Sequence, residues 1–414
     1  MKTTNIFKNL FRVTFITTGM FFISSCSTDD DSNDGDPILE VEPPIVLACN
    51  YFSENPNAIL EDNPNAPVDY IVTCNGMSIP DDVTIKPGVT IAFESDASFW
   101  VKNEGSLNAV GTSDKPITFT GVDKERGAWG GIFFASNDPK NEMNHTVVEY
   151  SGGTASSWST SEKGGVVIGA GASLKFHNNI VQHCQGWGLN LFYSANATNT
   201  IIENNTFKEN EIPLQISSPF IGLVKGSNQF INNTVNKVEV KCEYPINDSQ
   251  TIHKLLVPYS ITNGTNDFRV GNNGSLVVEP GTIIEMGEGK DIYVWGSLKA
   301  VGTLSEKITI KGATESPGSW GRIVYEDTTS PANQIKDVII KHAGEGANAT
   351  STHYYDRGAV VLIYNPRLLI EDTHFEDVLS CIISPSQHGV DNLTVGENIT
   401  TTNVNTAGVE NCSY

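Results

Sequence analysis

Four side chains suited to ligand binding lie in two polar segments of the chain. Trp158 falls within TASSWSTSEK, and His353, Tyr354 and Tyr355 fall within ANATSTHYYD. Aromatic rings with polar neighbours suit sugars, because a sugar ring offers both C–H patches and hydroxyl groups. We therefore treat these four residues as candidate glycan-binding residues. The alternative, that the rings fold back onto the body of the protein, stays open.

His177, His183 and Cys184 are metal ligands by residue type. Their spacing, His-x5-His-Cys, is not a standard zinc spacing, and neighbouring strand positions point to opposite faces. We expect no transition metal and no cofactor. The many Asp, Asn and Glu residues keep a Ca²⁺ site open, although the chain has no EF-hand loop and no nonapeptide calcium repeat.

An internal duplication indicates which elements must position these residues. Residues 87–132 and 280–323 share four motifs: Pro-Gly (87–88 and 280–281), Gly-Ser-Leu (105–107 and 296–298), Ala-Val-Gly-Thr (109–112 and 300–303) and Trp-Gly (129–130 and 320–321). A duplication at a fixed period is typical of repeat architectures. We predict two tandem units, 82–254 and 255–414, which form one continuous rod because no Gly/Ser-rich linker separates them. The repeated Trp129 and Trp320 are predicted to pack between coils.

Short apolar pairs of period 2 predict β-strands. The pairs are Ile91/Phe93, Phe99/Val101, Leu107/Ala109, Ile117/Phe119 and Ile132/Phe134. This spacing places both members of a pair on one face of a strand, and Gly, Asn, Asp and Pro in the gaps favour turns. The chain shows no sustained 3.6-residue pattern with caps, so we expect almost no helix.

Asn-Asn pairs recur at 178/179, 204/205 and 232/233. Asn tolerates the left-handed backbone conformation that sharp turns need, and stacked amide side chains can form a ladder. We predict that the three pairs stack in successive coils of a solenoid. Three ordinary Asn-rich hairpin turns are the alternative.

These motifs resemble the right-handed parallel β-helix, or pectin-lyase-like, proteins, in particular bacterial surface proteins with the pattern PGV.I.F … GSL.A.GT … I.FTG … W.GI. The resemblance covers the chain from about Asp69 onward. It implies an all-β solenoid in which neighbouring coils bury each other's apolar faces.

Many proteins of this fold are lyases or hydrolases of acidic polysaccharides. Such enzymes need paired carboxylates, or a Lys or Arg base with Ca²⁺ or an Arg that neutralises the substrate. The segment 387–389, Gln-His-Gly, faintly resembles a polygalacturonase element, but no Asp-Asp pair or Arg-x-Lys partner accompanies it. We therefore assign no catalytic residue.

The N-terminal segment has the features of a lipoprotein signal. Basic residues open the chain, Val13 to Ile23 is apolar but too short to span a bilayer, and Ile23-Ser24-Ser25-Cys26 resembles a bacterial lipobox. We predict a signal peptide at 1–25, a lipid on Cys26 and an acidic tether at 26–48. The acidic run after Cys26 resembles the surface-export signal of Bacteroidota lipoproteins, which implies an outer-membrane protein facing outward. An ordinary secretory signal and a plain spacer are the alternatives.

Cys49 and Cys74 bracket a Pro-containing segment before the first unit. An open end of a β-helix is an unpaired strand edge and needs a cover. We predict an N-terminal cap at 49–81, stapled by a Cys49–Cys74 disulfide, which suits an oxidising compartment. Cys184 and Cys381 lie in apolar strand patterns and are candidates for buried free thiols, and the pairing of Cys184, Cys242, Cys381 and Cys412 stays open.

Charge and composition limit the partners. A net charge of −22 disfavours nucleic acids and acidic polysaccharides, unless Ca²⁺ bridges the latter. The leading hypothesis is a monomeric cell-surface lipoprotein whose rod is a non-catalytic binding or adhesion module for glycans, in contact with the membrane only through its lipid. The alternatives are a divergent polysaccharide lyase or glycoside hydrolase, and a structural surface protein that binds another protein.

Overall fold

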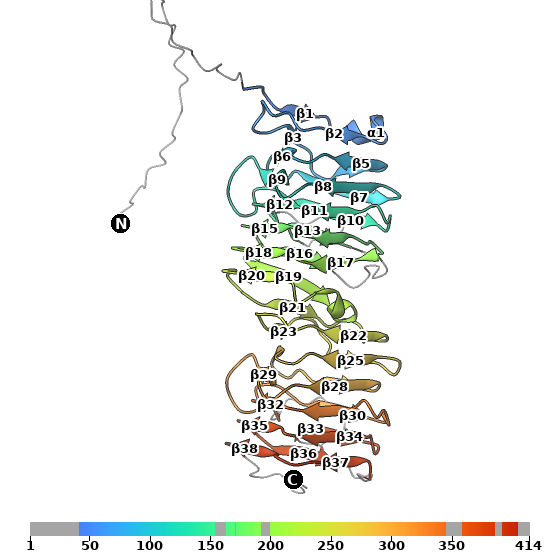
Figure 1. Cartoon of the computed structure of the whole chain (residues 1–414), viewed down its shortest axis with the longest axis vertical. Coiled ribbons are helices and arrows are strands. Elements are labelled where there is room, and N and C mark those ends of the chain that lie inside the picture. Colours follow the sequence, from blue (N-terminus) through green and yellow to red (C-terminus); the bar gives the residue numbers. More distant parts are fainter. Residues whose placement is uncertain are drawn as a thin grey trace, which may run out of the picture. The chain divides into compact units, whose positions relative to one another are not determined.

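Short parallel β-strands that wind in successive coils build the fold. A computed structural model describes residues 41–153, 163–169, 171–191, 199–344, 358–385 and 391–404. Strands adjacent in sequence do not pair with each other; β6 (Thr90–Phe93) pairs with β9 (Ile117–Gly121), and β9 pairs with β12 (Thr146–Glu149). Each coil therefore returns beneath the previous one, as in a parallel β-helix (Figure 1). This architecture confirms the predicted all-β parallel β-helix, whereas the division into two tandem units stays a prediction.

Three sheets begin at the N-terminal end of the stack. Sheet A contains β1 (Ile45–Leu47), β3 (Tyr70–Val72), β6, β9, β12, β15 (Ile180–Gln182), β18 (Thr206–Lys208) and β20 (Gln229–Ile231). Sheet B contains β2 (Ile59–Leu60), β5 (Asp82–Ile85), β8 (Ser106–Val110), β11 (Glu142–Asn144), β14 (Lys175–His177) and β17 (Ile201–Glu203). Sheet C is the longest and contains β4 (Met77–Ile79), β7 (Ser98–Asn103), β10 (Gly131–Ser136), β13 (Val166–Ile168), β16 (Trp187–Leu191), β19 (Ile212–Ser217), β21 (Val238–Lys241), β23 (Tyr259–Ile261), β26 (Ile283–Met286), β29 (Ile308–Gly312), β32 (Val338–Lys341), β35 (His374–Glu376) and β38 (Thr400–Thr402).

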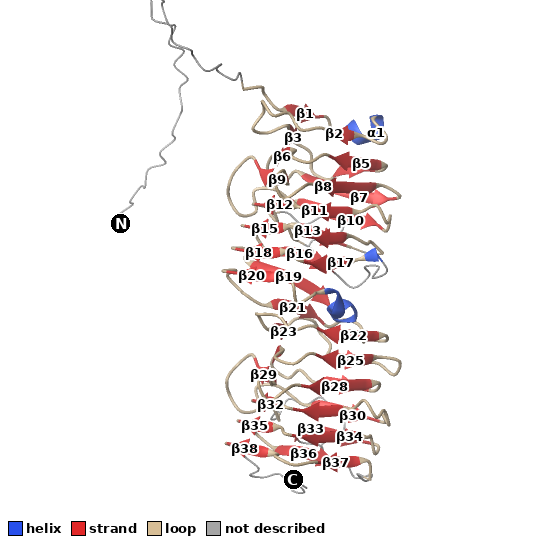
Figure 2. Cartoon of the chain, viewed as in Figure 1, coloured by secondary structure: helices blue, strands red, loops and turns tan. Residues whose placement is uncertain are grey.

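Two further sheets belong to the second half of the chain. Sheet D contains β22 (Ser249–Ile252), β25 (Ser275–Val278), β28 (Ser297–Val301), β31 (Gln334–Lys336), β34 (Leu368–Glu371) and β37 (Leu393–Val395). Sheet E contains β24 (Phe268–Val270), β27 (Ile292–Val294), β30 (Ile323–Glu326), β33 (Gly358–Ile363) and β36 (Cys381–Pro385). Figure 2 shows how little helix accompanies the strands; α1 spans Tyr51–Glu54 and the 3-10 helix η2 spans Ser218–Leu223. None of the helices in the described ranges is long and apolar enough to cross a bilayer.

The apolar pairs found in the sequence point into the interior of the coils. All ten members of the five pairs are at least 98% buried, from Ile91 to Phe134. They join one core cluster that extends from Leu47 in β1 to Ile383 in β36. The period-2 prediction is therefore confirmed, and the interior runs through both halves of the chain.

Strands that are equivalent in sequence belong to different sheets in the two units. In the first unit, β9 lies in sheet A, whereas its sequence counterpart β29 lies in sheet C. The change occurs at β21, which pairs with β19 on one side and with β23 on the other. The sequence repeat is therefore offset by one sheet from the hydrogen-bonded stack.

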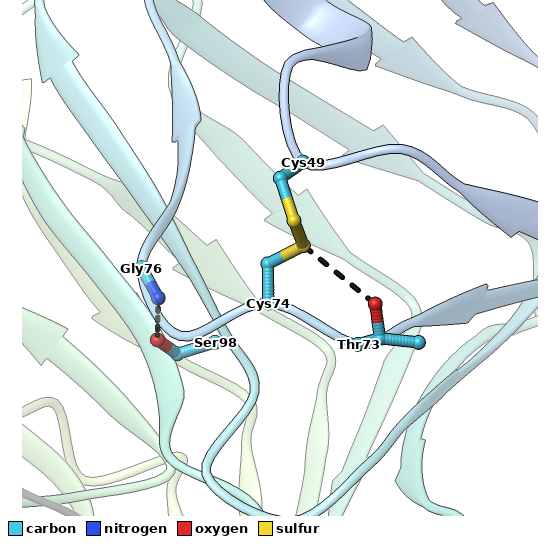
Figure 3. The surroundings of a disulfide bond; sticks show 5 residues. All are labelled: Cys49, Thr73, Cys74, Gly76 and Ser98. Atoms are coloured by element: carbon cyan, nitrogen blue, oxygen red, sulfur yellow. Dashed lines mark hydrogen bonds between the residues drawn. A yellow bond between two sulfur atoms is a disulfide. The ribbon is translucent and has the colours of Figure 1, made fainter.

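An N-terminal cap closes the first coil. Cys49, which follows β1, is bonded to Cys74, which follows β3, as predicted (Figure 3). Next to this disulfide, the Gly76 N–H donates to Ser98 Oγ at 2.8 Å. Phe52 of α1 is buried and packs edge-on against Phe99, with ring centroids 5.7 Å apart. The cap thus covers apolar side chains that an open end would expose.

The asparagine residues form two ladders rather than the single ladder predicted. In the first, Asn205 Oδ1 accepts bonds from Asn179 N and Nδ2, and Asn228 Oδ1 accepts bonds from Asn205 N and Nδ2. Asn233 stacks instead beneath Asn210, in a second ladder. The assignment of the pair 232/233 to the first ladder was wrong, because this pair follows a sheet A strand whereas the other two pairs precede one.

The remaining cysteines differ from one another. Cys184 and Cys242 are free and buried. Burial raises the pKa of the Cys184 thiol to about 11 and that of Cys242 to about 12, so both stay protonated and unreactive at neutral pH. Cys381 is disulfide-bonded, so its interpretation as a free thiol was wrong; its partner lies outside the described residues.

Candidate functional site

The predicted glycan-binding residues fall outside the described residues. These are Trp158, His353, Tyr354 and Tyr355. In the sequence, the two polar segments that contain them follow β12 and β32. Their role, like the lipid on Cys26, stays a prediction.

A hollow of about 500 Å³ lies on the outer side of sheet C in the second unit, beside the loop 313–319. It is lined by Ile283, Thr309, Lys311, Glu315, Ile339, Lys341, His342, Glu376 and Asp377. None of these residues was singled out from the sequence. The alignment of the two units contained a signal, since Lys311 and Lys341 stand where the first unit has Thr120 and Glu149.

Strand register arranges the floor of the hollow in rows. Ile283, Thr309 and Ile339 lie in register on β26, β29 and β32, and their side chains alternate with inward Ile284, Ile310 and Ile340. The next outward row, two residues along each strand, is Glu285, Lys311, Lys341 and Glu376. A row of two isoleucines and one threonine therefore lies directly beside a charged row.

The charged row is organised into ion pairs. Glu285 is buried and is shared by Lys237 and Lys311, the latter with its Nζ 3.3 Å from Glu285 Oε1. Lys341 Nζ lies 2.7 Å from Glu376 Oε2. The side chains of Lys311 and Lys341 keep 27% and 28% of their surface exposed, so each retains N–H groups that can reach a ligand.

His342 lies at the corner of the hollow and is buried. Its Nε2 is 3.7 Å from Asp377 Oδ2, and its Nδ1 has no hydrogen-bond partner within the described part of the chain. The residue occupies a left-handed turn position, with φ of 62°. A buried ring nitrogen without a partner costs free energy, and only 6% of the His342 side chain is exposed to the hollow and the solvent.

A repeated tryptophan anchors the loop beside the hollow. Trp320 is fully buried and donates from Nε1 to the Lys341 carbonyl at 2.7 Å, as Trp129 donates to the Glu149 carbonyl at 2.8 Å in the first unit. The prediction that both tryptophans pack between coils is confirmed. Figure 1 shows the wide loops that follow β9 and β29, both at the left edge of the stack.

The corresponding surface of the first unit, on sheet A, is filled by its own side chains. Lys124, from the loop 122–128, donates to Thr120 Oγ1 and lies 3.9 Å from Glu149 Oε1. The Tyr150 ring stacks on His183, with centroids 5.2 Å apart. Burial raises the pKa of Tyr150, and the nearby glutamates add to the shift.

An arginine fastens this loop of the first unit. Arg126 donates to the Glu209 carbonyl and, at 3.2 Å, to Thr234 Oγ1. The second unit has Pro317 at the corresponding position. Among the described residues, no side chain of 313–319 hydrogen-bonds to another coil, which leaves the hollow uncovered.

The arrangement can hold a ligand rich in hydroxyl groups. Ile283 and Ile339 can contact the C–H surface of such a ligand. The lysines can donate hydrogen bonds to it, and the carboxylates of Glu315, Glu376 and Asp377 can accept hydrogen bonds from it. Within the ranges that the structure describes, no three His, Cys, Asp or Glu side chains cluster as metal ligands. A Ca²⁺ site therefore remains a proposal.

Comparison with known proteins gives one match. Residues 70–169 match the family model described as "Pectate-lyase like beta helix domain". The match covers about a quarter of the chain and contains the first copy of the repeat. The search of curated proteins and the search of solved structures found no match.

Proposed function

We propose that this protein binds glycans through the hollow in its second unit. The observation that carries the proposal is the row of Ile283, Thr309 and Ile339 beside partly exposed lysine and carboxylate groups. Sugar rings need both kinds of surface side by side. A rigid solenoid also suits binding, because the positions of its side chains are fixed by strand register.

A blocking substitution tests the proposal. Ile339→Trp places a large ring in the hollow and should weaken binding to the glycan identified on an array by about tenfold or more. Val147→Trp is the matched control, since Val147 holds the same outward position on β12. Equal binding by both variants, or no glycan bound by the parent protein, would contradict the proposal.

Cleavage of a polysaccharide is the second candidate. It is favoured by the match of residues 70–169 to a pectate-lyase-like domain and by Lys341 and His342, which line the hollow beside the carboxylates of Glu376 and Asp377. Assaying the parent protein for unsaturated and for reducing-end products, with and without Ca²⁺, separates the two functions. Products that disappear in Lys341→Met would establish the enzyme.

We also propose that the rod is tethered to the outer membrane and faces outward. The lipobox-like Ile23-Ser24-Ser25-Cys26 and the acidic run behind it support this location. Cells labelled with palmitate should incorporate the label into the parent protein, and protease added outside should release the body. A Cys26→Ala variant that still carries the label and stays on the membrane would contradict the proposal.

A further inference from the structure

Two aromatic rings stack on the outer side of sheet E. Tyr293 points outward from β27, between inward-facing neighbours, and Trp295 follows the strand two residues later. Their ring centroids are 5.6 Å apart, and both residues are partly exposed. Trp295 Nε1 donates to Glu326 Oε2 of β30 at 2.8 Å. We call these three residues the Trp295 site; none of them lines the hollow on sheet C.

One face of the Trp295 indole is left without a side-chain neighbour in the strand layer. Tyr293 occupies the other face, so the free face points toward the turn that follows β27. The next residue is Gly296, and the residue in register with Trp295 on the preceding coil is Gly271. A Cβ atom on Gly296 would lie 2.1 Å from the Gly274 carbonyl oxygen, so this position excludes a side chain. Within the described ranges, no second ring stacks on the indole and no cation lies over it.

The equivalent surface of the first unit contains its own cation. Lys102 stands at the position of Trp295, and its Nζ lies 3.9 Å from the centroid of the Trp100 ring. The counterpart of Glu326 is Ala135, which is in register with Lys102. The first unit therefore combines an aromatic ring with an internal ammonium group. The second unit has the rings and a carboxylate, but no internal cation among its described residues.

The neighbouring charged groups leave Glu326 without a counter-ion. Arg322 pairs with Asp291, with its Nε 3.5 Å from Asp291 Oδ2. Arg269 lies on β24, two strands from Glu326, and donates to the Glu243 carbonyl at 3.2 Å. Glu326 accepts the indole N–H and forms no ion pair with any described residue. The Trp295 site therefore presents an aromatic face beside one uncompensated negative charge.

We propose that the Trp295 site binds a lysine or arginine side chain of a partner protein. A cation over an aromatic face is attracted by the quadrupole of the ring, and tryptophan gives the strongest attraction. The Glu326 carboxylate at the edge of the indole adds a charge-assisted hydrogen bond. The net charge of −22 attracts partners with a basic surface and repels acidic ones. This inference does not depend on glycan binding, because it concerns a different sheet and a different ligand.

A pair of small probes tests the inference. Nα-acetyl-arginine methylamide carries only its side-chain charge, and the citrulline analogue has nearly the same shape without the charge. Each is titrated into the full protein with isotope-labelled tryptophan, and the Nε1–H resonance of Trp295 is assigned by its absence in Trp295→Phe. The arginine probe should shift this resonance saturably and bind at least about fivefold more tightly than the citrulline probe.

Three variants assign the effect to the site. Glu326→Gln keeps an acceptor for the indole N–H but removes the charge, so the affinity for the arginine probe should fall to that for the citrulline probe. Asp114→Asn removes an exposed carboxylate of the first unit and should bind like the parent, as the control for long-range charge. Trp295→Lys reproduces the arrangement of the first unit and should lose binding, measured by saturation transfer to the probe. Glu326→Gln retains the hydrogen bond, so it decides the test if Trp295→Lys is unstable.

The contrary outcomes are distinct from those of the glycan test. Equal affinity of the parent for the two probes would overturn the inference, because the ring would then bind a planar group regardless of its charge. An affinity for the arginine probe that is unchanged in Glu326→Gln would also overturn it. Methyl β-glucoside is titrated in parallel; if it shifts the Trp295 resonance and the arginine probe does not, the site binds sugars and the inference is wrong. None of these results alters the comparison of Ile339→Trp with Val147→Trp, which tests the hollow.

Discussion

The corners beside the sheet A strands of the first unit are polar inside, whereas their counterparts in the second unit are mostly aliphatic. Asn179, Asn205 and Asn228 stack as a hydrogen-bonded ladder in the first unit. The positions that correspond to Thr146, Asn179 and Asn205 are Val338, Thr373 and Ile399; Val338 and Thr373 are fully buried, and Ile399 packs against the core partly buried. The same backbone corner therefore accepts either an amide ladder or an apolar stack.

The backbone at these corners is nevertheless the same in both units. The residue before each interior position has a positive φ: 57° at Asn178, 56° at Asn204, 50° at Asp337 and 48° at Asp372. Asn and Asp adopt this left-handed conformation at lower cost than other non-glycine residues. The left-handed residue sets the turn, and the interior residue decides only how the turn is stabilised.

The apolar interior that the two units share can be tested first, and substitutions in it have the largest expected effect on stability. Leu107 and Leu298 are 0% and 2% exposed, and their N–H groups bond to Asn141 Oδ1 and Asn333 Oδ1, respectively. Leu107→Asp and Leu298→Asp should each cost about 3–5 kcal/mol, because each buries an unpaired charge. Thermal unfolding measures the loss; variants that melt like the parent would show that the two positions do not share one core.

The asparagine ladder, which distinguishes the corners of the first unit from those of the second, gives the second prediction. Asn205→Ala leaves Asn179 N and Nδ2, the Phe176 carbonyl and Asn228 Oδ1 without a bond that they now make. The expected loss is about 2–4 kcal/mol. Thr373→Val removes one hydroxyl that bonds to the Glu371 carbonyl at 2.8 Å, and should cost about 1 kcal/mol. Equal melting temperatures for the two variants would show that the ladder adds nothing to the corner.

Local patterns in the sequence predicted the interior of the coils well. The period-2 pairs, Trp129, Trp320 and the Cys49–Cys74 disulfide all have the expected places. These features depend on neighbouring residues or on a motif that recurs, so a single chain is enough to find them. Burial of the repeated tryptophans follows from the same reasoning, because two equivalent coils bury equivalent residues.

Features that depend on the path of the chain were not predictable in this way. Between β19 and β20 the coil has no sheet B strand, and Val224 forms only an isolated bridge with Ile202. This irregular coil precedes the change of sheet at β21. As a result, the ladder continues from Asn205 to Asn228, which does not belong to an Asn-Asn pair. The hollow was missed for a related reason: the residues that line it come from three or more coils, and none of them forms a motif within its own coil.

The smallest predicted effect concerns the loops over the outer faces. Arg126 fastens the loop 122–128 to Glu209 and Thr234, whereas Pro317 makes no such bond. Each loop contains one glutamate, Glu125 or Glu315, so a glutamyl endopeptidase can compare them within one molecule. In the parent protein the bond after Glu315 should be cut faster, because cleavage requires the loop to leave its place on the coil.

Arg126→Ala should remove this difference. The two lost hydrogen bonds lie at the surface, so stability should fall by only about 1 kcal/mol or less, while cleavage after Glu125 should approach the rate after Glu315. Mass spectrometry of early fragments measures both sites, and Arg126→Lys, which retains the charge but not the forked geometry, should be intermediate. If the parent is already cut equally at both loops, the arginine clamp does not explain why one face is closed and the other carries a hollow.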